Sequence, residues 1–593
     1  MKMNKKIASL MAVILLLMST SVMSFAITST EITNKLIIQN DYSSTSVSLV
    51  DKVFTLYCIF DAEIIQGTED ADTGGFSDDG IDYSVNSDFV DFFQDLITKG
   101  TIVMPDDYDA LDEDEQTSAF DYAAMQYINS FYNSAEGIDN MQDLVVSLKT
   151  YIEEKDLDAN YTIDTTDTST NVTMSGAIET VTSGDITQAG YYLILDDTTL
   201  SVDDLGIVGA GALVTIPGRV SGGALSGDVT ISLKGSVPTI DKKVWHDDRS
   251  TVEGDVSPLV GTDGRWDVVA DYQIGDVVEY RIKVTIPSDV TGYDEYSMTI
   301  TDTLSDGIVL DEATLPTLYL DSELTDEVAG DAHKTTYIDS QNFTVTVDVL
   351  AALDNVPNVE EFYIYYTATV TEDAFIYSDY ESNVVTLKYP NNPYDSESYG
   401  TDSAEVYTYT FELDILKTKG DATTPLAGAV FALYVQDGEG AEKVQLFLEQ
   451  STDSDLEVDT YYPTSATPSG TNEGVITTDE SGKFNIIGLN DALTYYLKEI
   501  KAPEGYNVAD EISFTLHTTY EVNASGVSVP IITVAGSDFT LNSDGSLSAT
   551  VVNTSNSLLP STGGIGTTIF LIVGAIMMIT SIVLLIVLRK KDE

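Results

Sequence analysis

The sequence predicts a mainly β protein, built as tandem β-sandwiches that follow an α+β domain at the N-terminal end. The chain has 593 residues, 43% of them hydrophobic, which suits about three or four domains. Most of it consists of short runs rich in Val, Ile, Thr and Tyr, separated by Gly, Asn and Asp turns, and this pattern is typical of sandwiches. Residues 87–155 differ, because their apolar positions recur with the period of a helix.

The strand and helix patterns divide the chain into segments. We expect sandwich strands at 277–287, 343–350, 362–371 and 383–389, and a helical insertion in the first domain. Boundaries near 235 and 405 follow a glycine-rich stretch and a turn-rich stretch. The predicted organisation has five parts: a leader at 1–26, an N-terminal domain at 27–235, a middle domain at 236–405, a C-terminal domain at 406–557 and a terminal segment at 558–593.

Both ends of the chain carry apolar runs. Residues 1–26 combine early lysines, the run "LMAVILLLM" and the small-residue pattern "SFA", which predicts a secretory signal peptide cleaved after Ala26. A retained membrane helix is the alternative, but the run is short for one. At the other end, residues 565–588 are long enough to cross a bilayer, and Arg589, Lys590 and Lys591 would hold the tail on the cytoplasmic side.

The residues before that span are Leu559, Pro560, Ser561, Thr562 and Gly563. This "LPSTG" motif, the apolar span and the basic tail together resemble the cell-wall sorting signal of Gram-positive surface proteins. The resemblance implies that a sortase cysteine cleaves between Thr562 and Gly563 and passes the Thr562 carbonyl to an amine. It also implies a wall-anchored protein that the apolar helix retains transiently in the membrane.

Charge and cysteine content exclude other classes. The chain has 97 acidic and 27 basic residues, a formal charge of −70, which excludes nucleic-acid binding and indicates a solvated, mutually repelling surface. Cys58 is the only cysteine, so no intrachain disulfide is possible. We expect it to be a buried small hydrophobic residue, and the domains to be reinforced by something other than a disulfide.

Inward-facing polar residues are the candidate reinforcement. In "FELDILKTKGD", strand alternation that buries Phe411, Leu413 and Ile415 also sends Lys417 inward, where an unpaired charge is costly. Alternation likewise places Lys242 inward and Lys243 outward, and it directs Asp302 and Asn383 toward a core. Taken alone, this pattern also fits buried ion pairs or lysines that extend to the surface.

Three stretches of the C-terminal segment carry a second resemblance: "ILKTKGDATTPLAGAVFALY", "YYLKEIKAPEGYN" and "ATVVNTSNSLLPSTGG". With them the ectodomain resembles the shaft pilins of Gram-positive sortase-assembled pili, whose domains are immunoglobulin-like, CNA-B-like sandwiches. "YYLKEIKAPEGY" is similar to the family's E-box. The resemblance implies a Lys417–Asn553 isopeptide bond assisted by Glu499.

The middle domain resembles the fimbrial isopeptide-forming domain of the same family, in "VPTIDKKVWHDD", "YSMTITDTLSDG" and "SNVVTLKYPNNP". The resemblance implies a Lys242–Asn383 bond assisted by Asp302, with Lys243 as the alternative if the register slips by one residue. Desolvation favours a neutral lysine and a neutral acid, so the amine can attack a carboxamide that the acid polarises. Ammonia would leave, and no cofactor is required.

The first domain departs from the pattern. It offers Gln39 where the lysine is expected, and Leu193 and Ile194 where the E-box would carry Glu, so we predict no isopeptide bond there. Shaft pilins also present an exposed lysine before the middle domain that attacks the acyl-sortase. Lys234 is the candidate here, although Ser232 and Leu233 replace the family's Tyr and Pro. An exposed lysine without a role is the alternative.

Other motifs are weaker. The acidic loop 70–82 resembles a calcium loop, but Ile81 stands where an EF-hand needs Glu, so we expect a solvated loop and no metal site. His246, His333 and His517 lack metal-ligand spacing, and Trp245 and Trp266 are expected in the core.

The predicted function is a non-enzymatic shaft subunit of a covalent pilus that supports adhesion or biofilm formation. Its predicted partners are pilin-class and housekeeping sortases, neighbouring copies of the same chain, and peptidoglycan. Ancillary pilins and a host or matrix receptor are additional predicted partners. The alternatives are a wall-anchored adhesin that does not polymerise and a wall-anchored glycosidase, for which no catalytic motif emerges.

Overall fold

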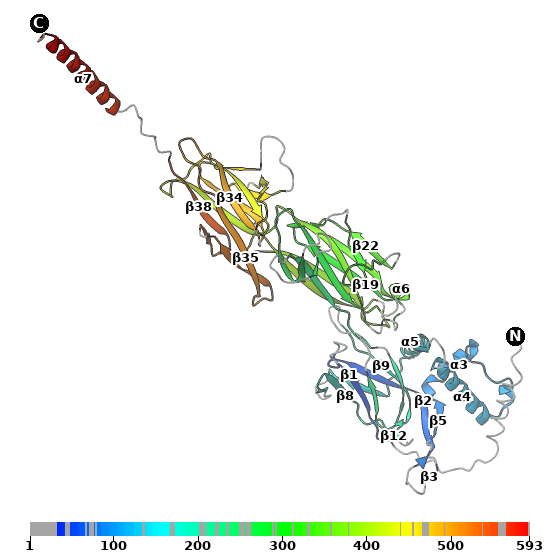
Figure 1. Ribbon diagram of the computed structural model, residues 1–593. Coiled ribbons are helices and arrows are strands. Elements are labelled where there is room, and N and C mark those ends of the chain that lie inside the picture. Colours follow the sequence, from blue (N-terminus) through cyan, green and yellow to red (C-terminus); the bar gives the residue numbers. More distant parts are fainter. Residues whose placement is uncertain are drawn as a thin grey trace.

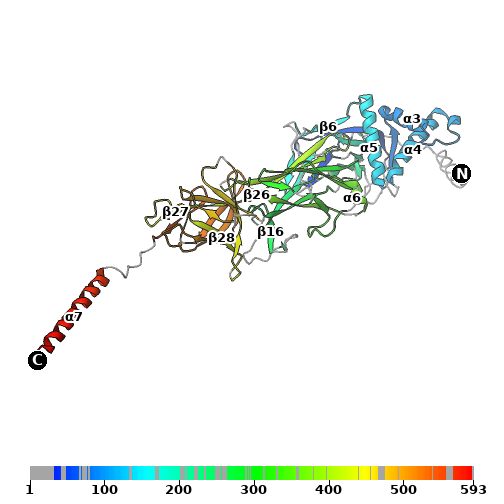
Figure 2. The same ribbon diagram turned by 90° about the horizontal axis from the view of Figure 1, so that it is seen from above.

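The computed structural model shows two β-sandwiches and an α+β region arranged in a row, followed by a separate helix (Figure 1). A view from above shows the same elongated arrangement (Figure 2). The structure describes residues 32–590 except for 42–47, 66–67, 70–75, 78–79, 133–136, 167–171, 201–207, 210, 220–224, 233–235, 248–254, 257–262, 288–289, 291–292, 294, 311–313, 329–331, 356–358, 378, 396, 439, 454–455, 465–473, 492, 537 and 556–564.

The N-terminal region combines two main sheets with helices, as predicted. One sheet has the order β13-β1-β8-β7 and the other β10-β9-β2-β5, with β6 paired to β2; β3-β4 and β11-β12 form two small ribbons. The strands are β1 (Leu36–Asp41), β2 (Val53–Ile65), β3 (Thr68–Glu69), β4 (Phe76–Ser77), β5 (Gly80–Val85), β6 (Tyr161–Asp164), β7 (Thr173–Ser175), β8 (Ile178–Thr182), β9 (Gly190–Asp196), β10 (Ala212–Ile216), β11 (Gly218–Arg219), β12 (Leu225–Gly227) and β13 (Val229–Ser232).

The helical insertion lies between β5 and β6. Its helices are α3 (Val90–Thr98), α4 (Glu113–Tyr132) and α5 (Gly137–Lys155). A reciprocal capping box begins α4, because Asp112 accepts from the Glu115 amide at 2.9 Å and the Glu115 carboxylate accepts from the Asp112 amide at 3.2 Å. The helices bury residues such as Phe93, Ile128 and Leu148 in one cluster with the sheet residue Leu193.

The middle sandwich packs a sheet of order β15-β16-β14-β18-β24-β20, with β21 paired to β24, on a sheet of order β17-β26-β25-β19-β23-β22. Its elements are β14 (Ile240–His246), β15 (Asp255–Val256), β16 (Asp263–Asp267), β17 (Val269–Asp271), β18 (Val277–Thr285), β19 (Ser297–Leu304), β20 (Ile308–Leu310), β21 (Thr317–Tyr319), β22 (His333–Tyr337), β23 (Asn342–Asp348), α6 (Val349–Asn355), β24 (Glu361–Val370), β25 (Glu381–Pro390) and β26 (Tyr399–Tyr409). All four strands that the sequence predicted here are present.

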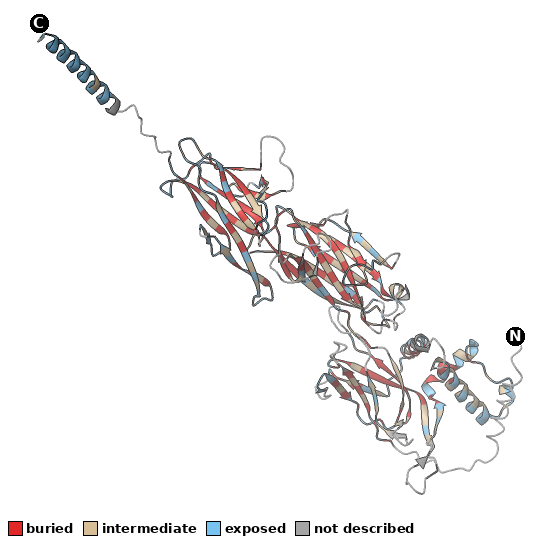
Figure 3. Ribbon diagram, viewed as in Figure 1, coloured by how far each residue is buried: buried red, intermediate tan, exposed pale blue. Residues whose placement is uncertain are grey.

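The C-terminal sandwich packs a sheet of order β30-β31-β33-β27-β38-β37 on one of order β29-β28-β34-β35-β36, with β32 paired to β28. Its strands are β27 (Phe411–Lys419), β28 (Val430–Gln436), β29 (Val444–Leu446), β30 (Leu448–Gln450), β31 (Thr460–Pro463), β32 (Ile476–Thr477), β33 (Lys483–Leu489), β34 (Thr494–Lys501), β35 (Ile512–Val522), β36 (Ser528–Ala535), β37 (Phe539–Leu541) and β38 (Leu547–Asn553). Colouring by burial shows buried residues throughout both sandwiches (Figure 3).

Helix α7 (Ile565–Arg589) stands apart from the sandwiches, and its side chains are exposed along nearly its whole length (Figure 3). Within the described residues it is the one helix long and apolar enough to cross a membrane, with a mean hydropathy of 3.0 over Thr568–Arg589. Its length matches the predicted span at 565–588.

The three parts of the ectodomain are joined by direct contacts. Residues between β25 and β26 reach the N-terminal region, where the Val208 amide donates to the Asn391 carbonyl at 2.8 Å and the Gly211 amide donates to the Tyr394 hydroxyl at 2.6 Å. The two sandwiches are connected through the single residue Thr410, which is fully buried and lies just beyond the predicted limit near 405.

Candidate functional site: two buried lysine, acid and asparagine sets

The middle sandwich brings Lys242, Asp302 and Asn383 into direct contact. Lys242 comes from β14 in one sheet, whereas Asp302 and Asn383 come from the neighbouring strands β19 and β25 of the facing sheet. The Lys242 ammonium donates hydrogen bonds to Asp302 Oδ2 and to Asn383 Oδ1. All three residues are at most 1% exposed. The set therefore spans the core between the two sheets.

The strand register explains this placement. Residues 298, 300, 302 and 304 of β19 alternate toward the core, and Leu304 lies opposite Asn383 in β25. Lys243 points to the other face of β14, where it is half-buried and pairs with Asp241 at 3.3 Å. Asn383 lies in the next-to-last strand of the sandwich, since β26 follows β25 in the same sheet.

Aromatic rings enclose the Lys242 amine. Its nitrogen lies 5.5 Å from the centre of the Tyr280 ring and 5.6 Å from that of Tyr366. The Tyr366 hydroxyl donates to Asp302 Oδ1 at 3.0 Å and accepts from Asn383 Nδ2 at 2.7 Å. Alternation in the predicted strand 362–371 places Tyr366 on the inward face, and a buried tyrosine hydroxyl needs a polar partner. The sequence thus contained a signal for Tyr366, but the prediction omitted it.

Burial moves the pKa values of the pair toward each other. Desolvation lowers the pKa of Lys242 to about 8, although the Asp302 charge acts in the opposite direction. Desolvation also raises the pKa of Asp302 above its usual range, opposed by Lys242 and by the Tyr366 hydrogen bond. Transfer of one proton from the amine to the acid is therefore easier here than in water.

The C-terminal sandwich contains the second set, Lys417, Glu499 and Asn553. Lys417 and Asn553 lie in adjacent parallel strands, because β27 pairs with β38 so that Lys417 is opposite Val551 and Lys419 is opposite Asn553. Glu499 reaches them from β34 in the facing sheet, and its Oε1 accepts from Asn553 Nδ2 at 2.8 Å. The three residues are at most 2% exposed.

The lysine of this set has different partners. The Lys417 ammonium donates to the main-chain oxygens of Val551 at 3.1 Å and Thr418 at 3.2 Å, rather than to the acid or the asparagine. Desolvation lowers the pKa of Lys417 to about 8, against the opposing charge of Glu499. Within the described residues, the buried Asn553 Oδ1 has no hydrogen-bond partner, which is costly for a carbonyl oxygen.

Both sets have the groups needed for amide exchange. A buried lysine that gives a proton to a buried acid becomes a neutral amine and a nucleophile. The protonated acid can then polarise or protonate the asparagine side chain as the amine attacks its carboxamide carbon. Such a reaction would release ammonia and leave a lysine–asparagine amide.

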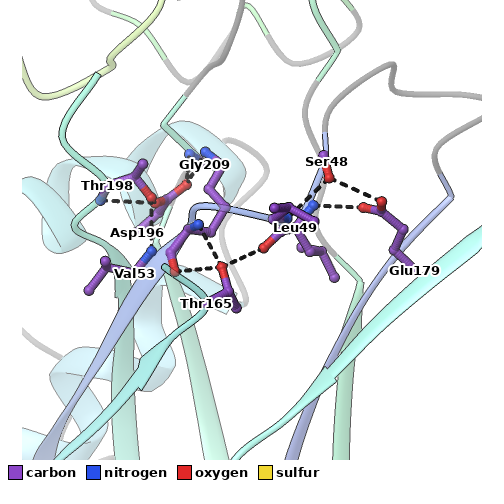
Figure 4. Close-up of polar contacts among 10 residues, drawn as sticks. Ser48, Leu49, Val53, Thr165, Glu179, Asp196, Thr198 and Gly209 are labelled. Atoms are coloured by element: carbon purple, nitrogen blue, oxygen red, sulfur yellow. Dashed lines mark hydrogen bonds and ion pairs between the residues drawn. The ribbon is translucent and has the colours of Figure 1, made fainter. Parts of the chain in front are cut away.

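A third buried lysine, Lys52, lies in the N-terminal region and was missed by the sequence analysis. Its amine lies 2.9 Å from Asp196 Oδ2, with both side chains at most 4% exposed. Asp196 also accepts from the amides of Thr198 and Gly209, as Figure 4 shows. Lys52 precedes β2, so strand alternation gave no indication of its direction. Four hydrogen-bond donors surround the Asp196 side chain, an environment that suits the acid of an ion pair.

Hydrogen bonds also hold the segment just before Lys52. Thr165 Oγ1 donates to the Leu49 carbonyl at 2.7 Å, and the Glu179 carboxylate accepts from the Leu49 amide at 2.6 Å (Figure 4).

The residues of the first domain that depart from the isopeptide pattern have ordinary structural roles. Gln39, which stands where the lysine is expected, donates to Ser232 Oγ at the surface. Leu193 and Ile194 are buried core residues of β9.

The remaining predicted residues are scattered or fall outside the description. The leader 1–26, Lys234, the motif from Leu559 to Gly563 and most of the loop 70–82 lie outside the described residues. Cys58 is buried as predicted, and burial raises its thiol pKa to about 12. Trp245 is buried and Trp266 half-buried. No cluster of three or more His, Cys, Asp or Glu suited to a metal occurs among the described residues. Two of the predicted histidines, His246 and His517, line one cavity.

Three family models match the chain. The Gram-positive pilin backbone subunit 2, Cna-B-like domain, matches residues 274–393, which include Asp302, Tyr366 and Asn383. The prealbumin-like fold domain matches residues 411–527, which include Lys417 and Glu499, and the LPXTG cell wall anchor motif matches residues 551–593. The chain therefore contains a Gram-positive backbone pilin domain, a prealbumin-like domain and a cell wall anchor motif. The tandem immunoglobulin-like, CNA-B-like architecture that the sequence predicted is thereby confirmed.

Solved pilin structures align with much of the chain at low identity. The T6 backbone pilin of serotype M6 Streptococcus pyogenes is 15% identical, with a TM-score of 0.48, over 88% of this chain and 99% of that chain. The full-length major pilin SpaD of Corynebacterium diphtheriae is 13% identical, with a TM-score of 0.45, over 89% and 98%. No curated protein matches the chain. The assignment of the individual domains therefore rests on the family models.

The anchor match gives the location of the chain, and the matches together support a general role. The anchor motif and the apolar helix α7 make the chain a cell-wall-anchored surface protein with transient membrane retention. The backbone domain and the anchor together support a sortase-anchored subunit of a pilus shaft, which is a structural role.

Proposed function

We propose that this chain is the shaft subunit of a covalent pilus and that each sandwich is closed by an internal isopeptide bond, Lys242–Asn383 in the middle and Lys417–Asn553 in the C-terminal sandwich. Asp302 and Glu499 assist these reactions. The observation that carries the proposal is the contact of one buried lysine amine with both an acid and an asparagine side chain in the middle sandwich. The division of the chain into domains at about residues 235 and 405 is also part of what we propose.

Subunits are joined in this proposal by an amide between Thr562 and Lys234 of the next copy. A pilin-class sortase forms the Thr562 acyl-enzyme, and a housekeeping sortase passes the last subunit to peptidoglycan. The strand before Lys234 supports exposure of its amine, because Val229 and Ile231 are half-buried while Thr230 and Ser232 are exposed. The fibre would hold the cell to surfaces or to other cells, with ancillary pilins or a receptor as further partners.

The internal bonds are tested by the mass of the full chain, produced without sortase and extracted in detergent. We expect a deficit of two ammonia molecules against the mass calculated from the sequence, reduced to one by Lys417→Ala and also by Lys242→Ala. A full-mass chain would show that neither lysine has formed a covalent bond.

Polymerisation is tested separately in a host with the sortases. High-mass ladders that resist boiling in detergent, and that disappear on Lys234→Ala, are the expected result. The control is Lys35→Ala, which removes an exposed lysine directly before β1, the strand that pairs with β13. Loss of the ladders in both variants would contradict the specific role of Lys234. A single wall-released band from the unchanged chain would favour a monomeric adhesin.

A further inference from the structure

The Tyr366 hydroxyl lies between the acid and the asparagine of the middle set. It is hydrogen-bonded to Asp302 Oδ1 at 3.0 Å and to Asn383 Nδ2 at 2.7 Å. We propose that Tyr366 is a catalytic residue for the Lys242–Asn383 bond and carries a proton from Asp302 to the departing Asn383 nitrogen. This inference rests on the proposed function, because it concerns how that internal bond forms.

The two sets differ in how the acid reaches the leaving nitrogen. In the C-terminal sandwich, Glu499 Oε1 contacts Asn553 Nδ2 directly at 2.8 Å. Asp302 is one methylene shorter, and its Oδ2 contacts the Lys242 amine while its Oδ1 contacts Tyr366. The path from Asp302 to the Asn383 nitrogen therefore runs through the tyrosine hydroxyl.

Tyr366 is held firmly in this position. It is 2% exposed, its ring stacks on Tyr280 at 5.1 Å between centres, and Phe343 meets it edge-on at 4.8 Å. Because Lys242, Asp302 and Asn383 are equally buried, bulk water does not reach the leaving group. The Asn383 nitrogen therefore has to gain its proton from a donor that is fixed inside the core.

The reaction balances with these groups alone. Lys242 first gives one proton to the Asp302 oxygen that it contacts, which leaves a neutral amine and a neutral acid, and a half-turn of the carboxyl group brings the protonated oxygen to face Tyr366. The amine lone pair attacks Asn383 Cγ, the new C–N bond forms while the C=O pair moves onto the Asn383 oxygen, and Nδ2 becomes a basic amine. Lys242 gives a second proton to the unprotonated Asp302 oxygen that now faces it, while the protonated oxygen gives its proton to the Tyr366 oxygen and Tyr366 gives its own to Nδ2. The Cγ–Nδ2 bond breaks, ammonia leaves, and Asp302 and Tyr366 remain protonated.

Tyr366→Phe tests this role, because it removes the hydroxyl and keeps the ring. The full chain is pulse-labelled in a host without sortase, and mass spectrometry of its digest follows the two cross-linked peptides over time. We expect the Lys242–Asn383 bond to form at least about tenfold more slowly, while the Lys417–Asn553 bond in the same molecules forms at the normal rate. The second bond also reports that the chain has folded.

Two further variants separate proton transfer from packing. Asp302→Glu in the Tyr366→Phe background lengthens the acid so that it can reach Nδ2 as Glu499 does, and we expect it to restore much of the rate. Tyr365→Phe removes a hydroxyl from the preceding residue of β24, which donates to Glu279 at 2.9 Å on the other face of the strand, and we expect a rate near that of the unchanged chain.

The outcomes are distinct. A normal rate in Tyr366→Phe, or an equal loss in Tyr365→Phe, overturns the role of Tyr366 but leaves the proposed bond intact. Failure of Asp302→Glu to restore any rate also contradicts the proton path. Absence of the Lys242–Asn383 peptide from the unchanged chain overturns the internal bond itself, and the inference with it.

Discussion

The amide of Asp491 donates a hydrogen bond to the Asp271 carboxyl group across the joint between the two sandwiches, with 2.6 Å between nitrogen and oxygen. Tyr520 completes the contact, since its hydroxyl donates to the other Asp271 oxygen at 2.8 Å. A cavity of about 540 Å³ adjoins this joint and is lined by residues that include His246, Arg265 and His517. The joint is therefore polar and contains two nearby acids.

This arrangement predicts that the joint weakens as pH rises. Burial, followed by the negative charge of Asp491, raises the pKa of Asp271 to about 8. The folded chain thus binds a proton that the unfolded chain releases near pH ~4, so stability falls as pH increases from about 4 to about 8, by at most about 1.4 kcal/mol for each pH unit. Calorimetry from about pH 5 to about pH 9 should show a falling unfolding temperature, and Asp271→Asn should flatten the profile.

Lys242→Ala should destabilise the middle sandwich far more than Lys243→Ala. Closing a loop across 141 positions would contribute about 5 kcal/mol through the entropy of the unfolded chain. Lys243 is half-buried and only pairs with Asp241, so its loss should cost less than about 1 kcal/mol. Urea denaturation compares the two variants, and equal losses would contradict the assignment of Lys242.

Lys52→Ala should destabilise the N-terminal region by about 3–5 kcal/mol, because it leaves Asp196 buried without its ammonium partner. The matched control is Lys155→Ala, which removes an exposed pair with Asp91 at 3.1 Å and should have a much smaller effect. Both values follow from urea denaturation monitored by circular dichroism. A loss at Lys52 as small as that at Lys155 would show that the ion pair contributes little.

Gly488→Ala should disturb the joint between the sandwiches. Gly488 has φ of +72°, and an added Cβ would lie 2.3 Å from the Ile274 side chain in the middle sandwich. Gly505→Ala is the control, since its φ is +89° but its Cβ would meet open space. Both substitutions incur about 1–3 kcal/mol of backbone strain, so any greater loss in Gly488→Ala reports the clash at the joint. Calorimetry of the two variants measures this difference.

Strand alternation was sufficient to predict the inward direction of Lys242, Asp302, Asn383 and Lys417, because every second residue of a sandwich strand faces the core. It could not predict which strands face each other. The family resemblance implied that Lys242 meets Asp302 and Asn383, and the structure adds that the contact is made across the two sheets. The Lys52–Asp196 pair was missed for a related reason. Lys52 precedes its strand and Asp196 ends another, where alternation no longer applies.

The parallel pairing of β27 with β38 determines how tension would pass through the C-terminal sandwich. The chain enters at Thr410, directly before β27, and leaves after Asn553, the last residue of β38. In a parallel pair these two points are at opposite ends, so pulling on them shears the strands past each other instead of unzipping them. With the proposed Lys417–Asn553 bond in place, the covalent route runs from residue 411 to 417 and crosses at once to 553. Once the bond has formed, everything between residues 418 and 552 is a bypassed loop, which can unfold without lengthening the fibre.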